Sequence, residues 1–323
     1  MPSAELRYDE LHRLGRPGAW RVFAGIPALV VLFFAGQVLL GVVVTVALAA
    51  TGASSHEITE RLSGDPATPS FLALVNLGWA AAIPFVLAVA LLVHGLAPGY
   101  VASVVGRLRW RWLLVCLGLA VVALAITVAV SSVLPDQGAG TVELGGHLNP
   151  WTSATRDFLL VVLLLTPLQA AGEEFVFRGY LAQAFGGLAA RYGARAGAAV
   201  AVVVPALLFA LAHGLGQDLP IFFDRFAFGL VAGLLVILTG GLEAGIAMHV
   251  LNNFLAFGMA LAYGDMTSAL TPTGGTWWAI PVTLTQSVAY LLLAVCAARR
   301  LGVANRSGEA GGGAILEPRR GRV

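Results

Sequence analysis

Eight runs of about twenty predominantly apolar residues follow one another along this chain of 323 residues. A helix rises about 1.5 Å per residue, so a run of about 20 residues is long enough to cross the hydrocarbon core of a bilayer. A helix also satisfies its own backbone hydrogen bonds, which the bilayer interior cannot do. The pattern therefore predicts an all-α polytopic membrane protein with about eight transmembrane helices, at residues 22–50, 70–93, 112–134, 157–187, 196–214, 219–239, 241–262 and 278–298.

The composition supports a membrane protein and limits its partners. The chain is 58% hydrophobic and 11% charged, whereas soluble domains carry about 25% charged residues. A net charge of +2 gives no reason to expect nucleic acid as a partner. The lipid bilayer is therefore the expected environment, and the sequence does not indicate an oligomeric state.

The distribution of basic residues, which are all arginines, predicts the orientation of the chain. Most of them lie in the segments that alternating spans put on the side of the N-terminus, namely residues 1–21, 94–111, 178–195 and 299–323. The loops on the other side carry only Arg61 and Arg156. Because cytoplasmic segments are enriched in Lys and Arg, both termini are predicted to be cytoplasmic. The arginine-only composition and compact loops favour the plasma membrane of a bacterium.

The spans divide the chain into five parts. We expect a cytoplasmic N-terminal arm (1–21), a first group of three transmembrane helices with an outer loop (22–156), a core of four helices (157–262), an outer loop with the eighth helix (263–303) and a disordered cytoplasmic tail (304–323). The tail is predicted from its scattered arginines and the run GEAGGGA.

Charged side chains in the fourth span need a reason, because each is costly in hydrocarbon unless it is paired or hydrated. Glu174 and Arg178 are four residues apart, so they share one face of a helix and can form an ion pair. Glu173 points about 100° away from that face and stays free of the pair. The two adjacent glutamates are therefore expected to have different roles.

His213, His249 and Asn253 lie in two further spans. His249 and Asn253 are also four residues apart, and counting residues from the inner span ends puts all three in one layer with Glu173, near mid-membrane. A carboxylate beside an imidazole can deprotonate water, and His and Asn side chains can donate hydrogen bonds to a tetrahedral oxyanion. The set favours hydrolysis by activated water, since neither the GxSxG nor the HExxH pattern occurs.

Each of these groups also has a purely structural interpretation. The glutamate–arginine pair can lock helix packing, His213 can simply bond a neighbouring carbonyl, and the His/Asn pair can join two helices. Asp224 and Arg225 are interpreted as a local charge pair near the outer surface, and Glu243 as an interfacial residue. The functional hypothesis rests on the combination of residues and not on any one of them.

Three motifs in this order resemble those of the CPBP family, the CAAX proteases and bacteriocin-processing enzymes. The family pattern EExxxR appears as EEFVFR at 173–178, FxxxH as FALAH at 209–213, and HxxxN as HVLNN at 249–253. The resemblance covers about residues 157–260. It implies intramembrane proteolysis in a water-filled cavity that opens to the cytoplasm or laterally to lipid.

Carried over to this chain, the resemblance implies that Glu173 activates water with help from His213, while His249 and Asn253 form the oxyanion site. The expected function is that of an intramembrane endopeptidase, a CAAX protease-like hydrolase acting on membrane-associated peptides or proteins. A proton-coupled transporter that uses buried Glu and His is one alternative, although no internal repeat is evident. A non-catalytic immunity or scaffold protein is another, although it would not need the complete motif set.

The resemblance further implies that Glu174 and Arg178 support the site. The family has been described both as zinc metalloproteases and as metal-independent glutamate proteases, and Glu173, His213 and His249 are the candidate metal ligands. We favour the glutamate mechanism, which requires no cofactor, because asparagine is a poor zinc ligand and a good oxyanion donor. Zinc or another divalent metal is the alternative.

Overall fold

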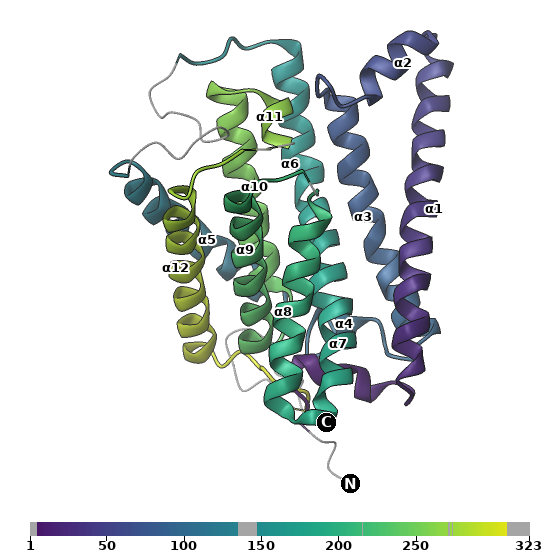
Figure 1. The fold of residues 1–323 in the computed structure, drawn as a ribbon, viewed down its shortest axis with the longest axis vertical. Coiled ribbons are helices and arrows are strands. Elements are labelled where there is room, and N and C mark those ends of the chain that lie inside the picture. Colours follow the sequence, from purple (N-terminus) through teal and green to yellow (C-terminus); the bar gives the residue numbers. More distant parts are fainter. Residues whose placement is uncertain (1–4, 135–146, 215, 271, 273, 309–323) are drawn as a thin grey trace, which may run out of the picture.

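The computed structural model of the chain describes residues 5–134, 147–214, 216–270, 272 and 274–308. Within these residues, eight helices are long and apolar enough to cross a membrane (Figure 1). They are α1 (Trp20–Ala50), α3 (Pro69–Leu92), α5 (Trp110–Ser131), the continuous helix Ser153–Tyr192, α8 (Ala194–Ala212), α9 (Leu219–Thr239), α10 (Glu243–Tyr263) and α12 (Ala279–Arg300). The predicted all-α polytopic membrane protein is confirmed, and the described residues form no β-strand.

Short helices connect or cover the long ones. They are η1 (Tyr8–Leu14), α2 (Ser55–Leu62), α4 (Gly99–Ala102) and α11 (Met266–Leu270). Helix α11 lies between α10 and α12 in the sequence, at the end of the bundle away from both chain ends (Figure 1).

The fourth span is longer than the predicted 157–187 and contains a change of helix type. It consists of α6 (Ser153–Glu174), a π-helical turn η2 (Phe175–Leu181), α7 (Ala182–Ala189) and a 3-10 turn η3 (Ala190–Tyr192). At about 1.5 Å per residue the helix is about 60 Å long, twice the thickness of the hydrocarbon core, so it projects from the bilayer. The π-helical turn begins directly after Glu174, and such turns are frequent at functional sites.

Helix α1 is apolar on all sides and largely exposed. Phe23, Val38 and Leu39 are each about two-thirds exposed or more. The helix packs against α3 at the edge of the bundle (Figure 1). In a membrane, lipid would cover this surface, so the exposed side chains of α1 can be apolar.

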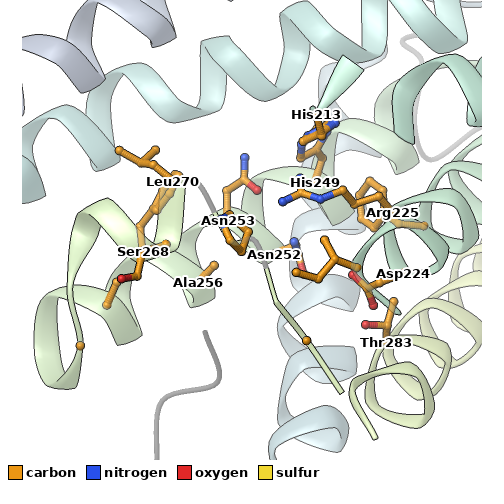
Figure 2. A pocket seen from close by; sticks show the side chains of 18 of the residues that line it. His213, Asp224, Arg225, His249, Asn252, Asn253, Ala256, Ser268, Leu270 and Thr283 are labelled. Atoms are coloured by element: carbon orange, nitrogen blue, oxygen red, sulfur yellow. The ribbon is translucent and has the colours of Figure 1, made fainter. Parts of the chain in front are cut away.

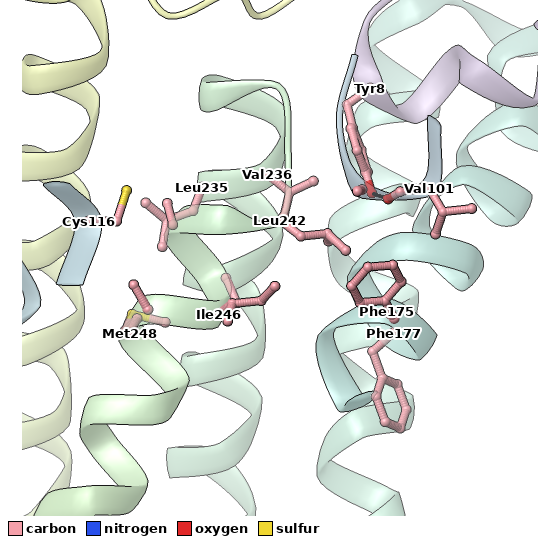
Figure 3. Close-up of a cluster of buried hydrophobic side chains, with 14 of the residues drawn as sticks. Tyr8, Val101, Cys116, Phe175, Phe177, Leu235, Val236, Leu242, Ile246 and Met248 are labelled. Carbon is pink, nitrogen blue, oxygen red and sulfur yellow. Dashed lines mark hydrogen bonds between the residues drawn. The ribbon is translucent and has the colours of Figure 1, made fainter. Parts of the chain in front are cut away.

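Helix α10 occupies the interior, packed against α5, α6 and α9. All eight residues of its first two turns, Glu243 to Val250, are buried. Figure 3 shows the apolar cluster around it, in which Leu242, Ile246 and Met248 contact the same core as Phe175 and Leu235. A helix that is buried on every side holds its polar residues in fixed positions, which is what a site needs.

A buried ion pair fixes the start of α10. Arg109 precedes α5, and its side chain donates hydrogen bonds from Nε and Nη2 to Glu243 at 2.8 and 2.6 Å. Its backbone N–H donates to the same carboxylate at 2.8 Å. Glu243 is fully buried inside the protein, and its interfacial depth stays a prediction.

The first and the last described segments meet at one end of the bundle (Figure 1). Leu6 accepts a hydrogen bond from the Ser307 backbone and donates its own N–H to the Ser307 hydroxyl. The predicted disordered tail, 304–323, therefore begins with packed residues, and the rest of it from residue 309 lies outside the described residues. An even number of spans puts both ends on the same side, and their cytoplasmic location remains a prediction.

Candidate active site

A cavity of about 910 Å³ lies among the helices, and Glu173, His213, His249 and Asn253 all line it. They come from α6, the end of α8 and α10, so the structure brings together all four predicted catalytic side chains. Figure 2 shows His213, His249 and Asn253 around the same space. Neither Glu174 nor Arg178 lines the cavity, and both are buried behind its wall. The expected division between the two glutamates is therefore seen in their placement.

Two glycines leave room for the part of α6 that carries the glutamates, one in α6 itself and one in α10. A side chain at Gly172 would collide with the backbone carbonyl of Trp79, so this glycine lets α6 pack closely on α3. A Cβ atom at Gly245 would lie 2.8 Å from Oε2 of Glu174, so this glycine leaves room on α10 for the carboxylate. The positions of both carboxylates thus depend on small residues in adjacent helices.

The Glu174 carboxylate lies between an arginine and an imidazole. Arg178 donates from Nη1 to Oε1 at 3.0 Å, as the spacing of four residues predicted. The same oxygen is 3.0 Å from Nδ1 of His249, which donates because a carboxylate only accepts. The guanidinium of Arg178 also stacks over the ring of Phe209, 4.2 Å from its centroid. Glu174 and Arg178 therefore orient His249.

A hydrogen-bond chain holds the Glu173 carboxylate at the cavity wall. The side-chain amide of Gln169 donates to Oε1 of Glu173. The side-chain amide of Asn253 in turn donates to the side-chain oxygen Oε1 of Gln169 at 3.0 Å. Nε2 of His249 lies 3.8 Å from Oε2 of Glu173, and that oxygen has no hydrogen-bond partner among the described residues. Glu173 is thus fixed through one oxygen and has the other free. It is also not independent of Glu174, since His249 contacts both.

Gln169 is a site residue that sequence reasoning missed. It lies four residues before Glu173 in an apolar span, the same spacing that pairs Glu174 with Arg178. Applying that rule to neutral polar side chains as well as charged ones would have identified it.

His213 lines the cavity without contacting the glutamates. It follows the last residue of α8, and its Nδ1 lies 2.8 Å from the carbonyl oxygen of Phe209. The structural interpretation, a histidine that bonds a neighbouring carbonyl, therefore describes one nitrogen. The ring nevertheless faces the cavity, and no hydrogen bond joins it to Glu173 in the described part of the chain.

Asp224 and Arg225 are not the surface charge pair that was predicted. Both side chains line the cavity, and they form no ion pair with each other. Oδ1 of Asp224 and Nε of Arg225 are buried without a hydrogen-bond partner among the described residues. Figure 2 shows Arg225 beside His213 and His249, and Asp224 beside Thr283. Neighbouring residues of a helix point about 100° apart, so adjacency in the sequence was a poor reason to expect these two side chains to pair.

The cavity reaches the end of the bundle opposite the chain ends. Its lining includes Gly264, Asp265 and Ser268, which are exposed and belong to the connection around α11 (Figure 1). The resemblance implied an opening to the cytoplasm or laterally to lipid. If the termini are cytoplasmic, an opening at α11 faces the outer side of the membrane. The predicted cytoplasmic termini and a cytoplasmic opening at α11 therefore cannot both be correct.

The candidate metal ligands do not form a ligand set in this arrangement. Zinc bound by nitrogen and oxygen needs several donors at about 2 Å from one point. Nδ1 of His249 bonds Glu174 and Nδ1 of His213 bonds the Phe209 carbonyl, which leaves Nε2 of each ring as the nitrogen that could bind a metal. In the described residues, however, no three His, Cys, Asp or Glu side chains are placed so that they could hold a metal ion together. Glu173, His213 and His249 are therefore not assembled as a ligand set, and metal dependence stays a prediction.

Comparison with known families agrees with the three motifs. Residues 155–255 match the family described as type II CAAX prenyl endopeptidase Rce1-like. The matched segment is less than a third of the chain and contains every residue of the three motifs. No curated protein and no solved structure matches the chain. Over residues 155–255, the chain is therefore similar to the Rce1-like proteases of the CPBP family.

Proposed function

We propose that the protein is an intramembrane endopeptidase that hydrolyses peptide bonds in membrane-associated peptides or proteins. The observation that supports this most directly is the Glu173 carboxylate, which lines a cavity inside the helical bundle with one oxygen free. The Rce1-like match over residues 155–255 gives independent support for a protease.

In the proposed reaction, a water molecule sits between Glu173 and His213. Oε2 of Glu173 takes a proton from the water, and the water oxygen attacks the carbonyl carbon of the scissile peptide bond. The tetrahedral intermediate then collapses, the C–N bond breaks, and the proton on Glu173 passes to the leaving amine. Gln169 and Asn253 keep the carboxylate in place, while the Glu174–Arg178 pair orients His249.

We propose that this chemistry proceeds without a metal or other cofactor. The test is activity after exhaustive chelation, together with the metal content of the purified protein. Full activity in metal-free protein supports the glutamate mechanism. Activity that is lost on chelation and restored by zinc would replace it with a metalloprotease mechanism.

We further propose that substrates enter from the outer side of a bacterial plasma membrane. The cavity mouth near Asp265 and Ser268 lies opposite the chain ends, which the arginine distribution puts in the cytoplasm. Labelling of single cysteines introduced at Ser268 and at Arg13 with a membrane-impermeant reagent in whole cells tests this orientation. Labelling at position 13 but not at position 268 would reverse it.

The function itself is tested with Glu173→Gln, which keeps the shape of the side chain and removes the base. The purified wild type should cleave peptides from a library in liposomes, and the variant should lose at least about 100-fold in rate. Glu60→Gln, at an exposed position of α2, is the matched control. A correctly folded Glu173→Gln protein with wild-type activity would refute the mechanism. Solute uptake without proteolysis, lost in the same variant, would favour the transporter.

A further inference from the structure

The two side chains predicted to stabilise the oxyanion, His249 and Asn253, each use one donor in another hydrogen bond. Nδ1 of His249 bonds Glu174, and its Nε2 faces Glu173 at 3.8 Å. The Asn253 amide donates to Gln169 at 3.0 Å. These contacts fix the carboxylates and leave the second N–H of Asn253 as the donor that this pair can offer. A reaction that builds negative charge on a carbonyl oxygen is accelerated by further donors in the same cavity.

Arg225 has donors available in the same cavity. Its guanidinium lines the space, makes no hydrogen bond or ion pair with any described residue, and has a buried Nε without a partner. Figure 2 shows it beside His213 and His249. The adjacent Asp224 lies beside Thr283, and no ion pair joins it to Arg225. An arginine inside a membrane span is costly, and an unpaired one facing a cavity indicates that its partner arrives from elsewhere.

We propose that Arg225 is a catalytic residue whose guanidinium donates hydrogen bonds to the oxyanion formed during peptide hydrolysis. This inference rests on the proposed function. When the water oxygen bonds to the carbonyl carbon, the proton from water goes to Glu173 and the carbonyl π electrons move to oxygen. Arg225 stabilises that negative charge without exchanging a proton. As the C–N bond breaks, the electrons return to re-form the carbonyl and the leaving amine receives the proton from Glu173.

The main competing assignment is a carboxylate of the substrate as the partner of Arg225, and the kinetics separate the two. We would compare Arg225→Met and Arg225→Lys on a neutral peptide and on a matched peptide that carries a carboxylate. An oxyanion role predicts that kcat falls about 100- to 1000-fold for both peptides in Arg225→Met, with KM little changed. Arg225→Lys should recover part of kcat. A loss confined to the KM of the carboxylate peptide would overturn the proposal.

Two further measurements separate catalysis from folding. Because the guanidinium has no partner in the resting protein, Arg225→Met should unfold at the same temperature as the wild type or above it. A peptide phosphinate, which resembles the tetrahedral intermediate, should lose at least tenfold more affinity for Arg225→Met than a substrate peptide does, measured in the Glu173→Gln background. A clear loss of thermal stability, or equal loss of both affinities, would contradict the proposal.

The exposed Arg61→Met serves as the control for removing an arginine. If the wild type cleaves no peptide, or if Glu173→Gln stays active, the proposed function fails. If the wild type cleaves, Glu173→Gln does not, and Arg225→Met has normal kcat, only the assignment of Arg225 fails.

Discussion

Two buried glutamate–arginine pairs contact helix α10, and they differ in how completely they are hydrogen-bonded. In the first, Arg109 donates twice from its side chain to Glu243 and also to the carbonyls of Ala304 and Thr239, at 2.8 and 3.0 Å. Neither of these two side chains has a buried polar atom without a partner. This pair joins α10 to the segments before α5 and after α12.

The second pair, Glu174 and Arg178, leaves much of its capacity unused. Arg178 makes one hydrogen bond, and its Nε and Nη2 are buried without partners. Oε2 of Glu174 and Oε2 of Glu173 are also buried without a hydrogen-bond partner among the described residues. Since an unsatisfied buried polar group costs about 1–3 kcal/mol, such a cluster is a poor way to hold helices together.

The difference distinguishes a structural clamp from a working site. A pair that serves only stability can satisfy all its donors and acceptors, as the first one does. Unsatisfied atoms next to a cavity indicate where water or substrate belongs, and the stability they cost must be supplied by other parts of the fold. The comparison makes predictions that can be ordered by size.

The largest expected effect is on stability, from removing one partner of the clamp. Glu243→Gln leaves the buried charge of Arg109 uncompensated and should lower the free energy of unfolding by about 3–5 kcal/mol. The activity of each folded molecule should stay nearly unchanged. Unfolding in detergent, with active-site titration of the folded fraction, measures both. A similar stability loss with an equally large loss of activity per folded molecule would break the comparison.

The next effect is on the rate, from cutting the chain that holds Glu173. A hydrogen bond to a charged group is worth about 1.5–3 kcal/mol, so Gln169→Leu should lower kcat about 10- to 100-fold. Because Asn253 acts on Glu173 through Gln169, adding Asn253→Leu should cost little more. Fully additive losses in kcat for the double variant would mean that the two amides act separately.

A smaller effect is expected from crowding the supporting carboxylate. Gly245→Ala puts a methyl group 2.8 Å from Oε2 of Glu174 and should cost about 1–3 kcal/mol of stability while reducing kcat. Gly258→Ala in the same helix has open space around it, so the helix should gain slightly from the alanine. Equal behaviour of the two variants in thermal unfolding and turnover would show that the position of Glu174 is not critical.

The smallest effect concerns a third polar cluster, away from the cavity. His12 and His94 stack with ring centroids 4.3 Å apart, and Nε2 of His94 lies 2.9 Å from the hydroxyl of Tyr180. Burial lowers the pKa of His12 to about 3 and the pKa of His94 to about 4. The folded protein therefore keeps both rings neutral where the unfolded chain, with a histidine pKa of about 6.5, takes up protons.

The sign follows from which state binds protons first. The stability contributed by neutral histidines is complete above about pH 6.5 and is lost as the pH falls toward 4. Lowering the pH from 7 to 5.5 should reduce the free energy of unfolding by about 1 kcal/mol for each of the two histidines. His94→Gln should remove the part of this reduction that comes from His94. The same pH slope in wild type and variant, measured by thermal unfolding, would show that His94 is not the group responsible. If His94→Gln instead abolished turnover, this histidine cluster would also be part of the active site although it lies outside the cavity.

Local spacing in the sequence was enough to predict the fold and the contacts within one helix. The apolar runs gave eight spans because bilayer thickness sets a minimum length, and the spacing of four residues gave the bond between Glu174 and Arg178. The prediction that His213, His249 and Asn253 lie near Glu173 also agrees with their placement around one cavity. Their catalytic roles remain predictions.

Contacts between distant segments could not be predicted in the same way. Glu243 meets Arg109, which is 134 positions earlier, and no periodicity connects them. Asp224 and Arg225 were predicted to be a local charge pair near the outer surface, whereas both line the cavity, because the direction of each side chain depends on how α9 packs against α8 and α12. His249 was expected in the oxyanion site, and its placement at the cavity wall between Glu173 and Glu174 depends on tertiary packing that the sequence does not show.

The pairing of Leu6 with Ser307 has a practical consequence for anyone who labels or shortens this protein. Trimming the predicted tail at residue 303 would also remove the Ala304 carbonyl that Arg109 uses. Two halves of a split fluorescent reporter, joined next to Leu6 and Ser307, would start from positions that are hydrogen-bonded to each other. The reporter signal would then show, in living cells, whether the segments around Leu6 and Ser307 have packed together.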